Sequence, residues 1–178
     1  MQALKRTVEA APDLGIDRLT VFGFSTENWR RPAQEVSDLM SLLKTFVNSD
    51  LDRLAREGVN VRVLGRRTDL TPDILDAARA FAEEVAAGRA RHDDLTEAGF
   101  EARLCTAGAP PPDLIVRTSG ERRLSNFLLW EAAYAEFVFQ DVFWPDYGPD
   151  ELRAAVDEYQ RRKRRYGGAD VDDVLATG

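Results

Sequence analysis

Apolar residues along this chain switch between helical and strand-like spacing, and the switches predict the order of its elements. Residues 3–11 have helical spacing, and residues 16–24 are a compact apolar run that predicts a strand. Pro32 fits the first turn of a long helix, whose apolar positions are 36, 39, 40, 43, 46, 47, 51 and 54. Gly58 ends that helix, and residues 59–64 predict the next strand. This order predicts an α/β fold with a mostly parallel central sheet flanked by helices.

The second half of the chain continues the same alternation. We expect strands over residues 114–117 and 138–144, and helices over residues 72–87 and 150–165. Residues 1–168 are predicted to form a single domain. The remaining residues, 169–178, are acidic and rich in small side chains, and we expect a disordered tail.

A polar turn follows the strand predicted over residues 114–117. Gly120 can adopt backbone angles that other residues avoid, and Ser125 stands where the N-cap of the next helix belongs. The turn therefore gathers Arg117, Arg122 and Arg123 between a strand end and a helix start. Guanidinium and backbone N–H groups in that setting suit a dense anion such as a diphosphate. A surface turn with solvated arginines is the alternative, and the strand–turn–cap context argues against it.

A second polar loop, residues 25–31, follows the strand predicted to end at Phe24. It offers hydroxyl groups, a carboxylate, an amide, an aromatic ring and two guanidinium groups within seven residues. Taken alone, it is equally well interpreted as a helix-capping loop. Ligands of parallel α/β sheets bind beyond the carboxyl ends of the strands, however, and both polar loops are predicted there.

The composition of the chain is that of a soluble domain and argues against a nucleic-acid-binding or membrane-spanning protein. The chain has 178 residues, of which 44% are hydrophobic and 31% charged, as in ordinary soluble domains. The net charge of −7 argues against nucleic acid as a partner. The single cysteine, Cys105, excludes an internal disulfide, and the single histidine, His92, lies in a polar stretch without nearby ligands. No apolar run approaches membrane-spanning length, and the first residues do not form a signal peptide.

Five motifs stand in order along the chain, at residues 24–32, 113–130, 133–137, 144–146 and 164–167. Together they resemble the cis-prenyltransferases, most closely the bacterial undecaprenyl diphosphate synthases, over about residues 2–168. The resemblance implies repeated addition of isopentenyl diphosphate to an allylic diphosphate, usually farnesyl diphosphate, with cis double bonds in the product. It also implies Mg²⁺ as the cofactor that assists loss of the allylic diphosphate. A nucleotide-binding module is a weak alternative, because the sequence lacks both glycine-rich phosphate motifs.

The resemblance further implies roles for individual residues. The substrate-binding residues would be Ser25, Thr26, Glu27, Trp29, Arg31, Arg117, Arg123, Leu124 and Ser125. Asn28 would be the catalytic residue, and because an amide is a weak base we expect it to position a proton path. Glu136 would help to hold magnesium, for which a carboxylate is a suitable ligand.

The resemblance implies a homodimer as well. Its interface would lie within residues 132–144, and the motif Arg165-Tyr166-Gly167 would reach the neighbouring subunit's site. A cytoplasmic location is expected, with peripheral contact at the inner face of the membrane through the long lipid product. The apolar positions of residues 36–54 could line a tunnel for that product, although ordinary core packing explains them equally well.

The chain departs from the family pattern in three places. The family opens with a strand and a loop carrying His-x-x-Asp-Gly-Asn-x-x-Trp, whose aspartate binds magnesium, and nothing here corresponds. Near Asp76 a core strand and an Asn-Tyr-Gly-Gly-Arg loop have no counterpart, so residues 72–87 would join two helices across the gap. Arg122 replaces a histidine that some relatives carry near the metal.

Three explanations of these departures remain open: residues omitted from the sequence, a truncated or wrongly predicted gene product, and a genuine variant. Two functional hypotheses follow. The first is an active cis-prenyltransferase that makes a polyprenyl diphosphate lipid-carrier precursor. The second is a non-catalytic partner subunit, or an inactive fragment, of such an enzyme.

Overall fold

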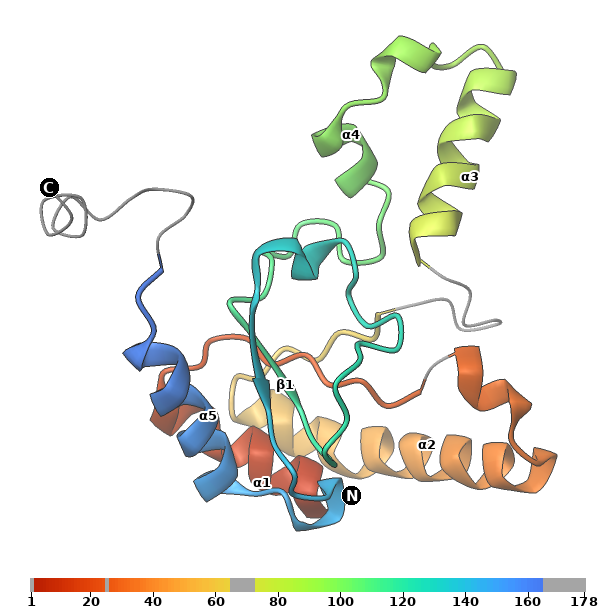
Figure 1. The fold of residues 1–178 in the computed structure, drawn as a ribbon. Coiled ribbons are helices and arrows are strands. Elements are labelled where there is room, and N and C mark those ends of the chain that lie inside the picture. The colour runs from red at the N-terminus through yellow and green to blue at the C-terminus, as the bar shows by residue number, and fades with distance from the viewer. Residues whose placement is uncertain (1, 25, 65–72, 165–178) are drawn as a thin grey trace, which may run out of the picture.

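The computed structural model describes residues 2–24, 26–64 and 73–164 of the chain (Figure 1). Two parallel strands lie at its centre, β1 (Leu114–Arg117) and β2 (Glu136–Phe139). Their register pairs Leu114 with Glu136 and Arg117 with Phe139. Helices pack beside this pair, so the expected α/β class is confirmed.

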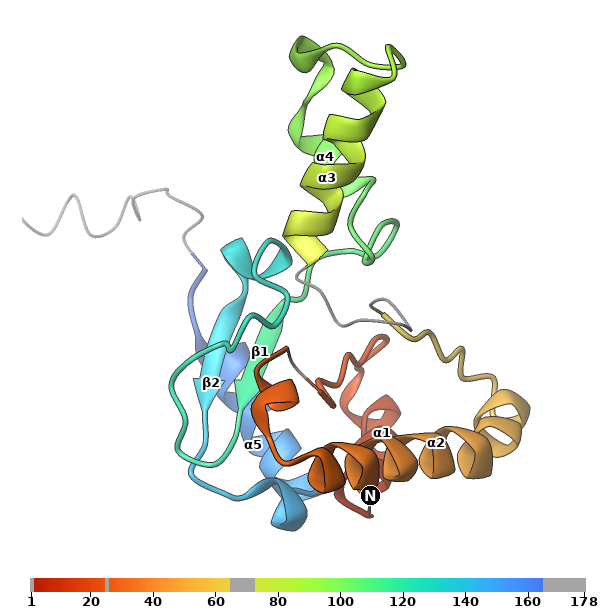
Figure 2. The same cartoon turned by 90° about the vertical axis from the view of Figure 1, so that its right-hand side faces the viewer.

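Helices α1 (Gln2–Ala10) and α5 (Pro149–Arg161) pack against each other, and α5 also packs on β2 (Figures 1 and 2). Their shared core contains Ala3, Tyr147 and Leu152, all of them nearly inaccessible to solvent. Arg6 closes one end of this packing by donating hydrogen bonds to the carbonyl oxygens of Pro145 (3.0 Å) and Tyr147 (2.9 Å). The predicted first and last helices are therefore confirmed.

The long predicted helix is α2 (Ala33–Arg56), which begins directly after Pro32. Gly58 follows its end with a φ of 75°, a conformation that glycine adopts at little cost. Helices α3 (Asp73–Ala86) and α4 (Glu97–Glu101) pack on each other and project from the rest of the molecule in both views (Figures 1 and 2). Arg103 joins them, because it pairs with Glu84 and lies over the ring of Phe81.

Short 3-10 helices occupy several connections: η1 (Pro12–Leu14), η2 (Thr26–Arg30), η3 (His92–Asp94), η4 (Glu131–Tyr134) and η5 (Trp144–Asp146). Within the described ranges, no helix is long and apolar enough to cross a membrane. The predicted tail and the motif Arg165-Tyr166-Gly167 lie outside the described residues. The single-domain assignment stays a prediction.

The strand predictions for residues 16–24 and 59–64 are wrong. Residues 18–24 and 60–64 form no backbone hydrogen bond with any other described residue, and both segments are drawn as coil (Figure 1). An apolar run becomes a strand only when a neighbouring strand pairs with its N–H and C=O groups. The strand predicted over residues 138–144 is displaced rather than absent, since β2 starts at Glu136 and stops at Phe139.

The helix expected after Ser125 does not form, so Ser125 is not an N-cap. The φ angles of Ser125 (49°), Asn126 (65°) and Leu128 (46°) are left-handed, and a right-handed helix cannot contain them. Residues 125–130 instead make successive turns before η4. The anion site predicted at this loop therefore has no helix dipole to support it.

Candidate functional site

The two polar loops that the sequence singles out meet around one cavity of about 290 Å³. Its lining residues are Phe22, Gly23, Phe24, Asn28, Arg31, Arg117, Arg123 and Ser125. Five of these eight are predicted site residues, and they come from segments almost 90 positions apart in the chain. The cavity lies at the carboxyl end of β1, where a parallel strand is expected to present its ligand.

Backbone contacts hold the second loop in place beside the cavity. Arg117 ends β1, and its carbonyl oxygen accepts a hydrogen bond from the N–H of Gln140 (2.8 Å). The N–H of Gly120 donates to the carbonyl oxygen of Gln140 (3.1 Å), which its φ of 67° permits. The rings of Phe22 and Phe127 stack at 4.8 Å and join the first segment to the second loop. The cavity walls are thus fixed relative to each other.

The charges around the cavity favour an anion. Three guanidinium groups line it, and none of its lining residues carries a carboxylate. Arg31 lies 3.8 Å from Glu35, and Arg123 pairs with Glu121, which sits in the same exposed loop. Among the described residues, the Arg117 guanidinium takes part in no ion pair. Arg117 is therefore the cation most available to a ligand.

Other predicted site residues lie outside the cavity lining. Trp29 packs edge-on against Phe24 at 5.2 Å, and the carbonyl oxygen of Leu124 accepts the Phe127 N–H at 3.0 Å. Arg122 does not line the cavity either. The backbones of Thr26 and Glu27 belong to η2, whereas their side chains and all of Ser25 fall outside the description.

One wall of the cavity is closed by residues that were not among the predicted site residues: Phe22, Gly23 and Phe24. A signal for them exists in the sequence. Glycine inside an apolar strand-like run often marks a place where a backbone or ligand approaches closely. Gly23 stands between two phenylalanines immediately before the polar loop, so this wall could have been anticipated.

Glu136, the expected magnesium ligand, lies apart from the cavity. It pairs with Leu114 at the opposite end of the strand pair from Arg117. Its carboxylate accepts a hydrogen bond from Arg162 (2.7 Å) and lies 3.8 Å from the Nε of Arg164. These contacts raise the pKa of Arg162, mainly through the hydrogen bond to Glu136. The described residues contain no group of three or more His, Cys, Asp or Glu that could hold a metal, and arginines engage the Glu136 carboxylate instead.

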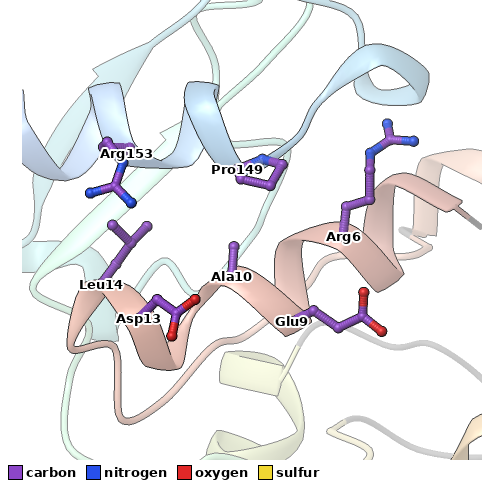
Figure 3. Close-up of a pocket in the computed structure, with 7 residues that line it drawn as sticks. All are labelled: Arg6, Glu9, Ala10, Asp13, Leu14, Pro149 and Arg153. Atoms are coloured by element: carbon purple, nitrogen blue, oxygen red, sulfur yellow. The ribbon is translucent and has the colours of Figure 1, made fainter.

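A second cavity of about 250 Å³ lies between α1 and α5 (Figure 3). Arg6, Glu9, Asp13 and Arg153 line it together with three apolar side chains. Arg6 is already bonded to backbone carbonyl groups, and Glu9 lies 3.3 Å from Arg53. Because the cavity is lined by both acidic and basic side chains, and Arg6 and Glu9 already have partners, we interpret it as a groove between packed helices and not as a ligand site.

Comparison with known proteins gives concordant matches. Residues 1–90 and 71–167 match the prenyltransferase family described as "Putative undecaprenyl diphosphate synthase". An isoprenyl transferase of Caulobacter vibrioides is 57% identical over all of this chain and 81% of its own length. An isoprenyl transferase of Agrobacterium fabrum is 44% identical over all of this chain and 84% of its own length.

Solved structures agree with the sequence matches. Lavandulyl diphosphate synthase from Lavandula x intermedia, solved with dimethylallyl diphosphate, has a TM-score of 0.80 and 30% identity. The match covers 93% of this chain and 85% of that one. A probable undecaprenyl diphosphate synthase from Campylobacter jejuni has a TM-score of 0.76 and 25% identity, over 93% of this chain and 90% of that one.

The matches also locate an internal gap. The Caulobacter alignment spans 209 residues against the 178 of this chain, so 31 positions of the alignment have no counterpart here. The two family matches overlap at residues 71–90, which places a break in the family pattern near the discontinuity expected at Asp76. On both sides of this break the family pattern holds, and the chain belongs to the undecaprenyl diphosphate synthase family of prenyltransferases.

Proposed function

We propose that this chain condenses isopentenyl diphosphate with an allylic diphosphate, farnesyl diphosphate being the expected one, to build a cis-polyprenyl diphosphate. The observation that carries the proposal is the convergence of Arg31, Arg117 and Arg123 on one cavity with Asn28 and Ser125. The allylic diphosphate in the related lavandulyl diphosphate synthase structure supports the substrate class.

Each cavity residue has a task that its chemistry suits. The three guanidinium groups can bind the oxygen atoms of a diphosphate in pairs, and each charge-assisted hydrogen bond contributes about 1.5–3 kcal/mol. The same groups stabilise negative charge that develops as the allylic diphosphate leaves. The Ser125 hydroxyl can donate to a phosphate oxygen, and the Asn28 amide can position the proton that the isopentenyl group loses.

Magnesium dependence belongs to the proposal because the family resemblance implies it. Magnesium would supply further charge neutralisation at the diphosphate. Glu136 is held by arginines in this chain, so its carboxylate is engaged away from the cavity. Removal of divalent cations with EDTA should abolish elongation, and restoring Mg²⁺ should recover it.

Homodimerisation and location complete the proposal. Tyr134 and Phe143 lie within the expected interface, residues 132–144, and both rings are mostly exposed in the single chain. A second copy of the chain would cover them. We place the enzyme in the cytoplasm, with peripheral contact at the inner face of the membrane where a long lipid product would leave.

A prenyl-transfer assay on the 178-residue chain tests the proposal. Farnesyl diphosphate, isopentenyl diphosphate and Mg²⁺ are supplied, and products are separated by chain length. Elongation supports the proposal. Absence of products together with tight diphosphate binding would favour the non-catalytic partner subunit, whereas absence of both would contradict any role for the cavity in diphosphate binding.

A further inference from the structure

The two walls of the cavity have few backbone ties to each other. Residues 18–24, which carry the first wall, form no backbone hydrogen bond with another described residue. The second loop is anchored at its start, but the backbone hydrogen bonds of residues 121–127 are local turns. The N–H of Glu121 donates to Thr118 (3.4 Å), and the N–H of Phe127 donates to Leu124 (3.0 Å). Side-chain contacts must therefore set the position of one wall relative to the other.

The second loop also has an unusual backbone conformation where it borders the cavity. Ser125, Asn126 and Leu128 have positive φ angles of 49°, 65° and 46°. Such angles are uncommon outside glycine, and they are unfavourable for a large side chain such as leucine. A backbone of this kind persists only where the surrounding contacts hold it in place. Because Ser125 lines the cavity, the contacts that hold this stretch also hold one cavity wall.

An aromatic pair joins the two walls. The ring centroids of Phe22 and Phe127 lie 4.8 Å apart and the ring planes are inclined by 25°, the geometry of an offset stack. Phe22 lines the cavity, whereas Phe127 stands within the left-handed stretch and is not a lining residue. Between described residues, no backbone hydrogen bond links residues 18–24 to residues 121–129. The ring pair is therefore the contact best placed to fix the spacing of the walls.

We propose that Phe22 and Phe127 are positioning residues, whose stacked rings hold the two arginine-bearing loops in the arrangement that binds one diphosphate. Arg31 belongs to the loop that follows Phe22, and Arg123 belongs to the loop that contains Phe127. Groups that are already held together bind a shared anion more tightly than groups that must first be brought together. This inference rests on the proposed diphosphate binding and adds to it a residue, Phe127, that lies outside the cavity lining.

Titration calorimetry of the 178-residue chain with inorganic diphosphate tests the ring pair. Phe22→Leu and Phe127→Leu keep an apolar side chain but remove the stack, and each should weaken binding by about tenfold. The double variant should bind no more weakly than either single variant, because either change alone breaks the pair. Phe22→Tyr retains the stacked ring and should keep the affinity of the unmodified chain.

Phe100→Leu is the matched control. The ring of Phe100 lies 4.7 Å from that of Trp130, and neither residue lines the cavity. The variant therefore loses an aromatic contact of similar spacing at a different place in the fold. Urea unfolding should show a loss of stability comparable to that of the other two leucine variants, whereas the affinity for diphosphate should stay unchanged.

The outcomes separate this inference from the proposed function. If Phe22→Leu weakens binding and Phe127→Leu does not, Phe22 acts by touching the ligand, and the ring pair has no positioning role. If Phe100→Leu weakens binding as much as they do, general destabilisation causes the loss. If the unmodified chain binds diphosphate and neither cavity variant binds more weakly, the proposed function stands and only the ring pair is excluded. Absence of binding by the unmodified chain would contradict both.

Discussion

Arg117 is the residue on which diphosphate binding should depend most. It lines the cavity without a carboxylate partner among the described residues, whereas Arg123 pairs with Glu121. Arg117→Ala should weaken the binding of inorganic diphosphate by about 2 kcal/mol, roughly 30-fold, because one charge-assisted contact is lost. Titration calorimetry measures this. The diphosphate affinity of Arg117→Lys should lie between that of the unmodified chain and that of Arg117→Ala, since lysine keeps the charge but lacks the planar guanidinium group.

A matched control for this prediction is Arg89→Ala. Arg89 is exposed and lies outside the cavity, so its loss changes net charge equally without touching the site. Diphosphate affinity should hardly change. If both alanine variants weaken binding to the same degree, the effect is one of overall charge, and the cavity is not the binding site.

Tyr147 should make stability depend on pH in the alkaline range. It is 2% exposed, and burial, with a smaller contribution from the charge of Glu151, raises its pKa from 10.0 to about 12. Below pH 10 both states keep the proton, and between about 10 and 12 only the unfolded state releases it. The free energy of unfolding should therefore fall by up to about 3 kcal/mol across this range.

Urea unfolding at about pH 9 and about pH 11 checks this. Tyr147→Phe removes the titrating group and should flatten that part of the profile. Among the described residues the Tyr147 hydroxyl has no hydrogen-bond partner, so the variant should be at least as stable near neutral pH. If the free energy of unfolding of Tyr147→Phe falls as steeply between about pH 9 and about pH 11, titrating groups other than Tyr147 cause the loss of stability.

At the scale of elements, α5 depends on the start of its first turn. The Glu151 carboxylate accepts a hydrogen bond from the N–H of Gly148 at 2.9 Å, which fixes the entry of the chain into the helix. Glu151→Ala should lower the free energy of unfolding by about 1 kcal/mol in urea titrations. Asp150→Ala removes a charge from the same turn but no hydrogen bond to the helix start. It should lower the free energy of unfolding by only a few tenths of a kcal/mol. If both variants lose the same free energy of unfolding, the loss is due to the interaction of the negative charges with the helix dipole and not to the hydrogen bond with Gly148.

The helices were predictable from sequence because their signals are local. The spacing of apolar residues and the punctuation by Pro32 and Gly58 identify α2 without knowledge of the rest of the chain. The strands over residues 16–24 and 59–64 were mispredicted because a strand depends on distant partners, and local composition cannot show whether a partner exists. The helix predicted after Ser125 does not form because residues in this loop adopt left-handed backbone angles. Apart from glycine, few residue types indicate such angles in a sequence.

The candidate site was predictable to the extent that it lies in contiguous motifs. Five residues of the two predicted loops line one cavity: Asn28, Arg31, Arg117, Arg123 and Ser125. This agrees with the expectation that both loops lie at the same edge of the fold. The position of Glu136 was not predictable in this way. Its distance from Arg117 follows from the register of β1 and β2, a pairing that local patterns leave undetermined.

At the scale of the whole molecule, the proposed homodimer built on residues 132–144 would cover the exposed rings of Tyr134 (88%) and Phe143 (65%). Phe139, on β2, adds a third partly exposed ring nearby in the chain. Exposed apolar residues that form one contiguous patch mark protein–protein interaction sites, and aromatic residues are enriched at the centre of interfaces. Phe143→Asp should therefore weaken the dimer by about 2 kcal/mol, roughly 30-fold in dissociation constant, measured by sedimentation equilibrium.

Leu42→Asp is the control, because Leu42 is about half exposed on α2, outside the expected interface. It should leave the dimer intact. The unpaired strand segments offer a competing way for two copies to associate, and Val63→Asp separates the two arrangements. If Val63→Asp dissociates the dimer while Phe143→Asp does not, copies pair through their open edges. That result would contradict the proposed interface within residues 132–144.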